Sequence, residues 1–169
     1  MHRYQILIEY VGLNFVGWQT QSHGKSIQKL IQTKLSKLLK EKILLIGSGR
    51  TDAGVHAIEQ SAHFECKKEI HNLDKFLKSV NHFVNNMNVS ITNIKKRNLN
   101  FHARFSAKQR IYKYVIFNRL SRPSIEKGRG WHIIKKLDIS LMKKGAKKIL
   151  GTKDFSTFRS SSCNAKSPI

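Results

Sequence analysis

Acidic residues are scarce in this chain of 169 residues. It contains 10 Asp and Glu against 32 Lys and Arg, which gives a formal net charge of +22 at pH 7 and a pI near 10.4. This surplus is atypical of an enzyme that acts on a small neutral substrate, and it indicates a polyanionic partner. Because Lys, Asn and Ile are all abundant, the alternative that some of these lysines are only solvated surface stays open.

Cysteines and long apolar runs are few as well. The chain has two cysteines, Cys66 and Cys163, without Cys-x-x-Cys spacing, which excludes a disulfide framework and is typical of a reducing compartment. His63, Cys66 and His71 could be considered as metal ligands, but these three scattered residues lack a fourth partner, so we expect no metal. Residues 1–10 resemble no signal peptide and no run is long enough to span a membrane, so we expect a cytoplasmic protein without a membrane partner.

The most informative stretch is Gly-Arg-Thr-Asp-Ala-Gly-Val-His at residues 49–56. It follows the apolar run 43–46, which we expect to be a buried strand, so the octet is predicted to lie on the loop that leaves this strand. Asp52 offers an ionised oxygen nucleophile, and Arg50 offers a planar cation suited to phosphate. This pair suggests chemistry on a nucleotide, although a turn in which Asp52 and Thr51 bind backbone donors would use the same residues.

The octet, with its flanks, resembles the signature of the TruA family of tRNA pseudouridine synthases, in which such a loop carries the catalytic aspartate. Further segments resemble the family in the same order along the chain. They are residues 9–10, 14–21, 26–28, 101–107, 110–114 and 154–159. The similarity therefore runs from residue 4 to about residue 159.

The resemblance implies isomerisation of uridine to pseudouridine in the anticodon stem-loop of tRNA. This reaction breaks the N1–C1′ bond, turns the uracil and rejoins it through C5, so it requires no cofactor but does require a stabilised cation-like sugar or covalent adduct. Asp52 is the implied nucleophile, whether at C1′, at the ring or through elimination. Tyr112 matches the tyrosine that stacks on the target base, and Arg50 the arginine that holds the nucleotide out of the stack.

Both substrate-binding candidates have structural alternatives. Tyr112 could be a core tyrosine on a strand face that it shares with Tyr114, and Arg50 could form a salt bridge within its loop. The segment 101–105 places two aromatic residues beside a cation, which could hold RNA or could pin a crossover between domains.

Periodicity predicts six elements in the first hundred residues. We expect strands at residues 4–10, 42–47, 60–66 and 89–94, a helix capped by Ser26, and a second helix at 73–84. The order βαββαβ is typical of a ferredoxin-like domain, with both helices on one sheet face and the other face free to meet RNA. We therefore predict an α+β fold with this domain at residues 1–100.

A second α/β domain of the pseudouridine synthase fold is expected at residues 101–169. The pattern predicts strands at 110–118 and 131–134 and a helix capped by Asp138. Because two strands and one helix make a poor closed core, we expect this domain to be incomplete. The chain is then expected to be a C-terminally truncated member of the family. The resemblance implies a homodimer for the full-length protein.

Three other functions would use some of the same features. A non-catalytic basic RNA-binding remnant of the family would share every feature but activity. An RNA recognition motif would need closely spaced aromatic residues in strand 60–66, where only Phe64 occurs. A magnesium-dependent phosphoryl-transfer enzyme would use a second carboxylate near Asp52, where the sequence offers only Glu59, and the chain has no P-loop motif. We favour a pseudouridine synthase with tRNA as its partner.

Overall fold

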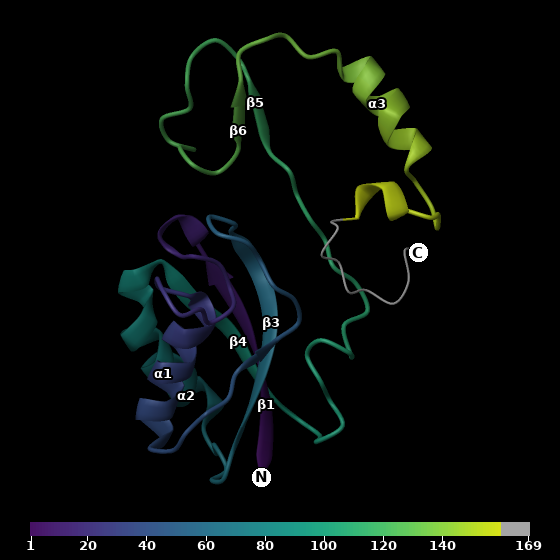
Figure 1. Ribbon diagram of the computed structural model, residues 1–169. Helices are drawn as coiled ribbons and strands as arrows, with labels where there is room; N and C mark the ends of the chain where they lie inside the picture. Colours follow the sequence, from purple (N-terminus) through teal and green to yellow (C-terminus); the bar gives the residue numbers. More distant parts are fainter. Residues whose placement is uncertain (160–169) are drawn as a thin grey trace. The chain divides into compact units, whose positions relative to one another are not determined.

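The computed structural model describes residues 1–159 and divides the chain into two compact units, Met1–Lys113 and Tyr114–Ile169. The first unit is a mixed α/β structure built on one four-stranded sheet (Figure 1). Its elements are β1 (His2–Tyr10), α1 (Ile27–Leu39), β2 (Ile46–Gly47), β3 (Ala57–Cys66), α2 (Leu73–Val84) and β4 (Val89–Arg97), with short 3-10 turns η1 (Gly12–Asn14) and η2 (Asn85–Met87).

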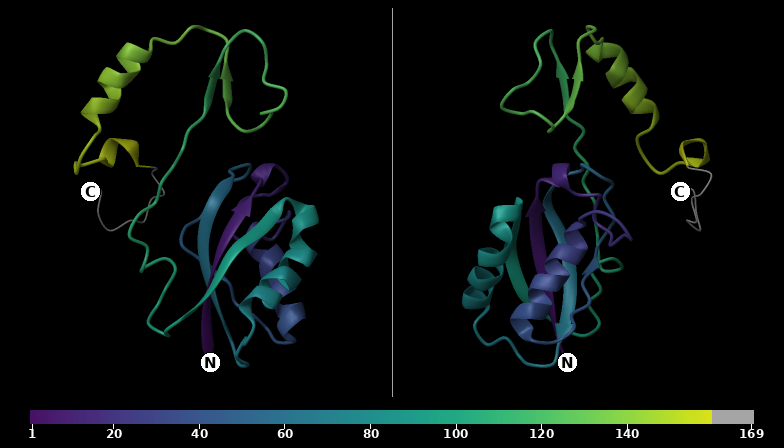
Figure 2. Two further views of the ribbon diagram at one scale, coloured as in Figure 1. Left: turned by 180° about the vertical axis from the view of Figure 1, so that it is seen from behind. Right: turned by 60° about the vertical axis from the view of Figure 1, so that its left-hand side comes forward.

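The sheet has the strand order β2-β3-β1-β4, and all neighbouring strands are antiparallel. Both helices cover the same face of it (Figure 2). Alternate residues of β1 point to that face, and Tyr4, Ile6 and Ile8 are each at most 1% exposed. The helices add Ile27, Ile31, Leu35, Val80 and Val84 to the same core. The expectation of a fold that mixes helices with a sheet is confirmed, and the sheet is antiparallel.

Side chains cap the start of both helices, at Ser26 as predicted and at Asn72. The Ser26 hydroxyl accepts a hydrogen bond from the Lys29 amide, and the Asn72 side chain accepts one from the Lys75 amide. Each bond satisfies an amide that the first helical turn leaves without an intrahelical partner. The predicted helices are therefore confirmed, α2 with the expected limits.

The apolar run 43–46 is a shorter strand than predicted. Ladder pairing is confined to Ile46–Gly47, and Leu44 is 65% exposed. The reason is that the backbone groups of Leu45 are hydrogen-bonded to side chains of α1 instead of to a neighbouring strand. The Leu45 amide donates to Gln32 Oε1 at 3.1 Å, and its carbonyl accepts from Gln28 Nε2 at 2.8 Å. A strand over 42–47 was therefore wrong, although Ile43 and Leu45 are buried as expected.

The sheet face opposite the helices is covered at one end by the segment that follows β4. The Ala103 amide donates to Nδ1 of His63 at 3.1 Å, and both residues are 2% exposed. The Arg3 guanidinium donates to the carbonyls of Leu99 and Phe101. The prediction that this face is free to meet RNA was therefore wrong at this end, because the crossover segment, residues 98–110, packs against it.

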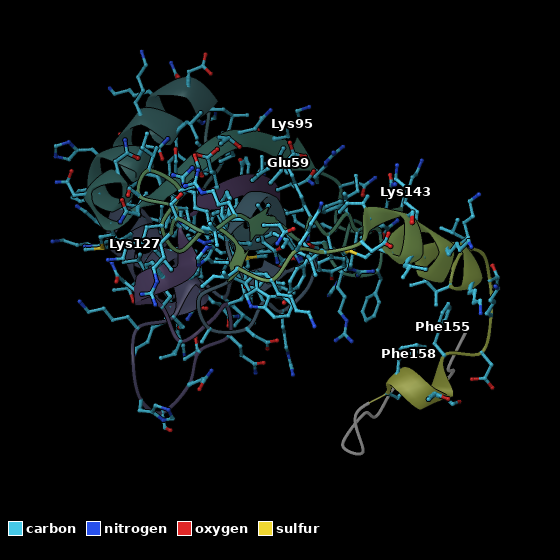
Figure 3. The ribbon with its side chains drawn as sticks, turned by 90° about the horizontal axis from the view of Figure 1, so that it is seen from above. Glu59, Lys95, Lys127, Lys143, Phe155 and Phe158 are labelled. Carbon is cyan, nitrogen blue, oxygen red and sulfur yellow. The ribbon has the colours of Figure 1, made fainter. Side chains whose placement is uncertain are left out.

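The described part of the second unit contains β5 (Ile116–Asn118), β6 (Trp131–Ile133), α3 (Ile139–Lys148) and the 3-10 turn η3 (Ser156–Phe158). β5 and β6 are parallel, and Asp138 caps α3 as predicted. Residues 110–115 form no strand ladder within the described chain, so the strand predicted at 110–118 was too long. In Figure 3, Lys143 extends from α3, and Phe155 and Phe158 lie with their ring centroids 6.2 Å apart.

Residues 101–113, which the sequence assigned to the second domain, belong by their contacts to the first unit. The domain limits at 1–100 and 101–169 otherwise stay predictions. Cys163 lies outside the described residues.

Candidate active site

The signature loop, residues 49–56, is anchored from the end of β1 and from the turn that follows it. The Trp18 amide donates to the Thr51 carbonyl at 3.0 Å, and the Tyr10 hydroxyl lies 2.8 Å from Thr51 Oγ1. Tyr10 is 2% exposed, and burial raises the pKa of its phenol, so it stays a neutral hydrogen-bonding group at pH 7. Thr51, next to Asp52, is thereby held on both its backbone and its side chain.

Two glycines allow this anchoring. A Cβ at Gly17, where φ is +112°, would lie 2.6 Å from the Thr51 carbonyl oxygen. A Cβ at Gly12 would lie 2.0 Å from the Val55 carbonyl oxygen, and the Gly12 amide donates to Nδ1 of His56 at 3.3 Å. At Gly12 and Gly17 the backbone therefore touches the loop with no room for a side chain.

Asp52 and Arg50 are both exposed on this loop. Within residues 1–159, the Asp52 carboxylate makes no hydrogen bond or ion pair, and the Arg50 guanidinium makes none either. The loop salt bridge considered for Arg50 is thus not formed in the described chain. Both charged groups are available to a ligand.

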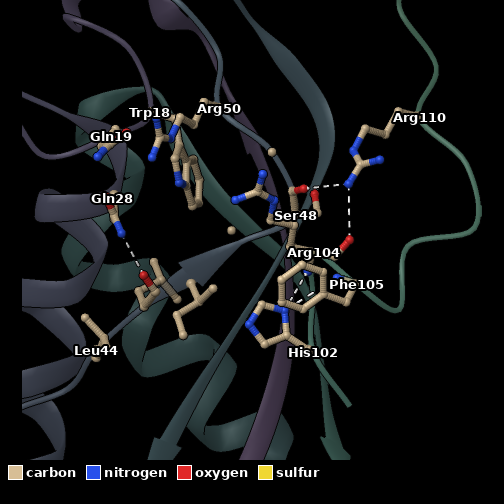
Figure 4. Close-up of a pocket in the computed structure, with 14 residues that line it drawn as sticks. Trp18, Gln19, Gln28, Leu44, Ser48, Arg50, His102, Arg104, Phe105 and Arg110 are labelled. Atoms are coloured by element: carbon tan, nitrogen blue, oxygen red, sulfur yellow. Dashed lines mark hydrogen bonds between the residues drawn. The ribbon is translucent and has the colours of Figure 1, made fainter. Parts of the chain in front are cut away.

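An open cavity of about 810 Å³ lies beside the beginning of the loop (Figure 4). It is lined by residues 44–50, by Trp18, Gln19 and Gln28, and by His102, Arg104, Phe105 and Arg110. The lining holds three arginines and no carboxylate. Arg50 belongs to it, whereas Asp52 and Tyr112 do not.

Arg110 joins the loop to the crossover segment. Its Nη2 donates to the Ser48 carbonyl at 3.0 Å and to the Arg104 carbonyl at 3.2 Å, as the dashed lines in Figure 4 show. From β3, Gln60 Nε2 donates to the Gly49 carbonyl at 2.8 Å. The sequence grouped Arg104 and Arg110 with family-like segments but did not predict that they meet at one cavity.

Tyr112 is 79% exposed. The alternative that it is a core tyrosine therefore does not hold in the described structure. Tyr112 follows Arg110 by two residues, so the segment that carries it is tied to the start of the signature loop. Its proposed contact with a target base stays a prediction.

His63 of β3 and His102 of the crossover segment form a ring pair, with centroids 4.8 Å apart. Nδ1 of His63 must be unprotonated to accept the Ala103 amide, so this contact requires the neutral imidazole. Burial, and then the charge of His102, lower the pKa of His63 to about 4. The neutral ring is therefore the stable form in the folded state.

Because of His63, we expect the free energy of unfolding to decrease as the pH is lowered. Between pH 6.5 and 4 the unfolded chain binds a proton at this residue and the folded chain does not, so acid favours unfolding. The loss should be about 2 kcal/mol between pH 7.5 and pH 5, measured by urea denaturation. His63→Gln keeps an acceptor that does not titrate, and it should flatten this dependence; an unchanged pH profile in that variant would contradict the assignment.

The three residues considered as metal ligands do not form a site. His63 lies on the sheet face opposite the core, whereas Cys66 is buried on the helix side, where Sγ donates to the Lys68 carbonyl. Burial raises the pKa of the Cys66 thiol to about 11, which disfavours the thiolate that binds metals. Among residues 1–159, no three His, Cys, Asp or Glu residues are grouped to hold a metal ion. In this same range, no helix combines the length and apolarity that a membrane span requires.

Comparison with known proteins places the chain in a family of enzymes. The family model described as tRNA pseudouridine synthase matches residues 6–106, which include the signature loop and the cavity up to Phe105. The chain therefore belongs to the tRNA pseudouridine synthase family, a family of isomerases.

Its relatives define the branch of that family. Over 169 residues the chain is 80% identical to tRNA pseudouridine synthase A of Pelagibacter ubique (strain HTCC1062), a match that covers 100% of this chain and 69% of that protein. It is 42% identical over 168 residues to tRNA pseudouridine synthase A of Wolbachia pipientis wMel, covering 99% of this chain and 68% of that protein. The predicted membership of the TruA family is confirmed.

Proposed function

We propose that this protein isomerises uridine to pseudouridine in the anticodon stem-loop of tRNA, with Asp52 as the nucleophile. The observation that carries the proposal is the signature loop itself: Trp18 holds the backbone of Thr51 and Tyr10 holds its side chain, while the Asp52 carboxylate has no partner in the described chain. A fixed backbone with an available carboxylate is what nucleophilic catalysis requires.

Arg50 and Tyr112 are proposed to bind the target nucleotide. Arg50 lines the cavity, two residues before Asp52 in the signature loop, and presents a planar cation that could contact a phosphate or replace the lost stacking of an extruded base. The exposed ring of Tyr112 could stack on the uracil. The segment that carries Tyr112 is linked to the loop through Arg110.

The proposed chemistry needs no cofactor. The reaction moves the uracil from N1 to C5 without net oxidation, so the protein must stabilise the sugar or ring intermediate and accept the C5 proton. Asp52 supplies the negative charge for the intermediate. Release of tritium from C5-labelled uridine in an anticodon stem-loop measures this step directly.

We further propose that the first unit is a ferredoxin-like domain, followed by a second domain of the pseudouridine synthase fold. The βαββαβ element order, the antiparallel strand order β2-β3-β1-β4 and the placement of both helices on one face support this. We also propose that the protein acts in the cytoplasm, where tRNA is modified; a homodimer stays a prediction.

RNA binding should depend steeply on salt. With a net charge of +22, the protein is expected to bind through several phosphate contacts, so log Kd should rise linearly with log salt concentration. Titration of an anticodon stem-loop RNA followed by fluorescence anisotropy at about 50 to 200 mM salt should give at least about a hundredfold loss of affinity. A flat response would show that the charge surplus is not used to bind RNA.

A further inference from the structure

We propose that the arginine-lined cavity is a subsite for a second, unstacked RNA nucleotide next to the target uridine. In it, Arg104 and Arg110 contact the phosphate and Phe105 stacks on the base. The inference rests on the proposed function, because Arg50 belongs both to this cavity and to the loop that carries Asp52.

The charge of the cavity favours an anionic ligand. Three guanidinium groups, from Arg50, Arg104 and Arg110, line it without any Asp or Glu. Elsewhere in the same unit Arg3 is paired with Glu65. Within the described residues the guanidinium of Arg104 has no hydrogen bond or ion pair, so like charges gather here without compensation from the protein.

The geometry of the arginines suits a phosphate. Both hydrogen bonds of the Arg110 guanidinium within the described chain use Nη2, which fixes the group and leaves its other N–H donors for a ligand. Arg104 is fixed at its backbone, where the amide donates to His102 Nδ1 at 3.2 Å and the carbonyl accepts from Arg110. Two guanidinium forks on a fixed backbone can bind one phosphodiester through several N–H groups.

The aromatic side of the cavity suits an unstacked base. Phe105 is 78% exposed, and its ring centroid lies 4.4 Å from that of His102. The Arg104 guanidinium carbon lies 5.9 Å from the same ring centroid. An exposed aromatic ring that contacts neighbouring side chains and lies beside a cation without an acidic partner is the arrangement with which proteins hold single-stranded nucleic acid. The occupant is therefore an RNA nucleotide rather than a bare anion.

The affinity of the 169-residue chain for an anticodon stem-loop RNA tests this directly. Arg104→Gln should weaken binding about fivefold to tenfold and lower the log-log salt slope by about 1. Phe105→Ala should weaken binding about tenfold with the salt slope unchanged, because stacking involves no phosphate. Lys37→Gln, which removes an exposed charge of α1, is the matched control and should change affinity less than about twofold.

A second measurement locates the ligand independently of these variants. Trp18 lines the cavity, and Trp131 is the other tryptophan of the chain. In a Trp131→Phe background, RNA should therefore change the fluorescence of Trp18, and Phe105→Ala should shift that titration to higher RNA concentration. Arg104→Lys keeps the charge but not the fork, so it should bind between wild type and Arg104→Gln.

The outcomes separate the two proposals. If wild type binds RNA but both cavity variants behave like Lys37→Gln, the subsite is overturned and the proposed function stands. If wild type binds no RNA, both are overturned. If uridine monophosphate or inorganic phosphate alone produces the full Trp18 response and Arg104→Gln weakens it as much as it weakens RNA, the cavity is a site for free phosphate compounds and the RNA assignment is wrong.

Discussion

Asp52→Asn is expected to reduce pseudouridine formation by at least about a thousandfold. Asn keeps the size of the side chain but lacks the negative charge, so it can neither attack nor stabilise a cation-like sugar. The loop should keep its shape, because its anchors are Thr51 with Tyr10 and Trp18 rather than the Asp52 side chain. Binding of tRNA should therefore stay within about tenfold, a change near 1.4 kcal/mol.

The assay is tritium release from C5-labelled uridine in tRNA. It is run on the chain itself and on a fusion with the part of the Pelagibacter ubique relative that the match leaves uncovered, since the chain spans 69% of that protein. Asp74→Asn, in the first turn of α2, makes the same chemical change at another exposed position and should leave the rate unchanged. Turnover in the Asp52→Asn fusion close to that of its parent would remove Asp52 from the nucleophile role, and an inactive parent fusion would favour the non-catalytic remnant.

Gly17→Ala is expected to destabilise the first unit by about 2 to 4 kcal/mol. The added methyl group would lie 2.6 Å from the Thr51 carbonyl, and the backbone at Gly17 has a φ of +112° that an L side chain rarely adopts. Both penalties act on the contact that holds Thr51 next to Asp52, so activity should fall together with stability. Urea denaturation followed by the fluorescence of Trp18 measures the change.

Gly54→Ala is the matched control for this substitution. Gly54 also has a positive φ, +77°, but no atom lies within 4 Å of the position of its Cβ. It should therefore show only the conformational cost, about 1 kcal/mol. Equal losses at Gly17 and Gly54 would mean that the contact with Thr51 does not limit stability.

Local signals in the sequence were sufficient for most elements of the first unit. Ser26 predicted the start of α1 because a serine before a helical pattern can accept the hydrogen bond of a first-turn amide. The alternation in β1 predicted its buried face, since successive side chains of a strand point to opposite sides. Where a strand required a partner, these signals failed: residues 110–115 have strand-forming composition but no neighbour to pair with in the described chain.

The sequence by itself determined the family, the loop that carries Asp52 and the positive charge, because a catalytic motif and a charge surplus are properties of residue identity and order. Only the tertiary structure decided that the backbone at Gly12 and Gly17 supports this loop, that the crossover segment covers one end of the sheet above His63, and that Arg104 and Arg110 meet Arg50 at one cavity. These arrangements join segments up to 62 residues apart through backbone carbonyls and amides. Every residue type except proline carries both groups, so the sequence contains no local signal for the contacts they make.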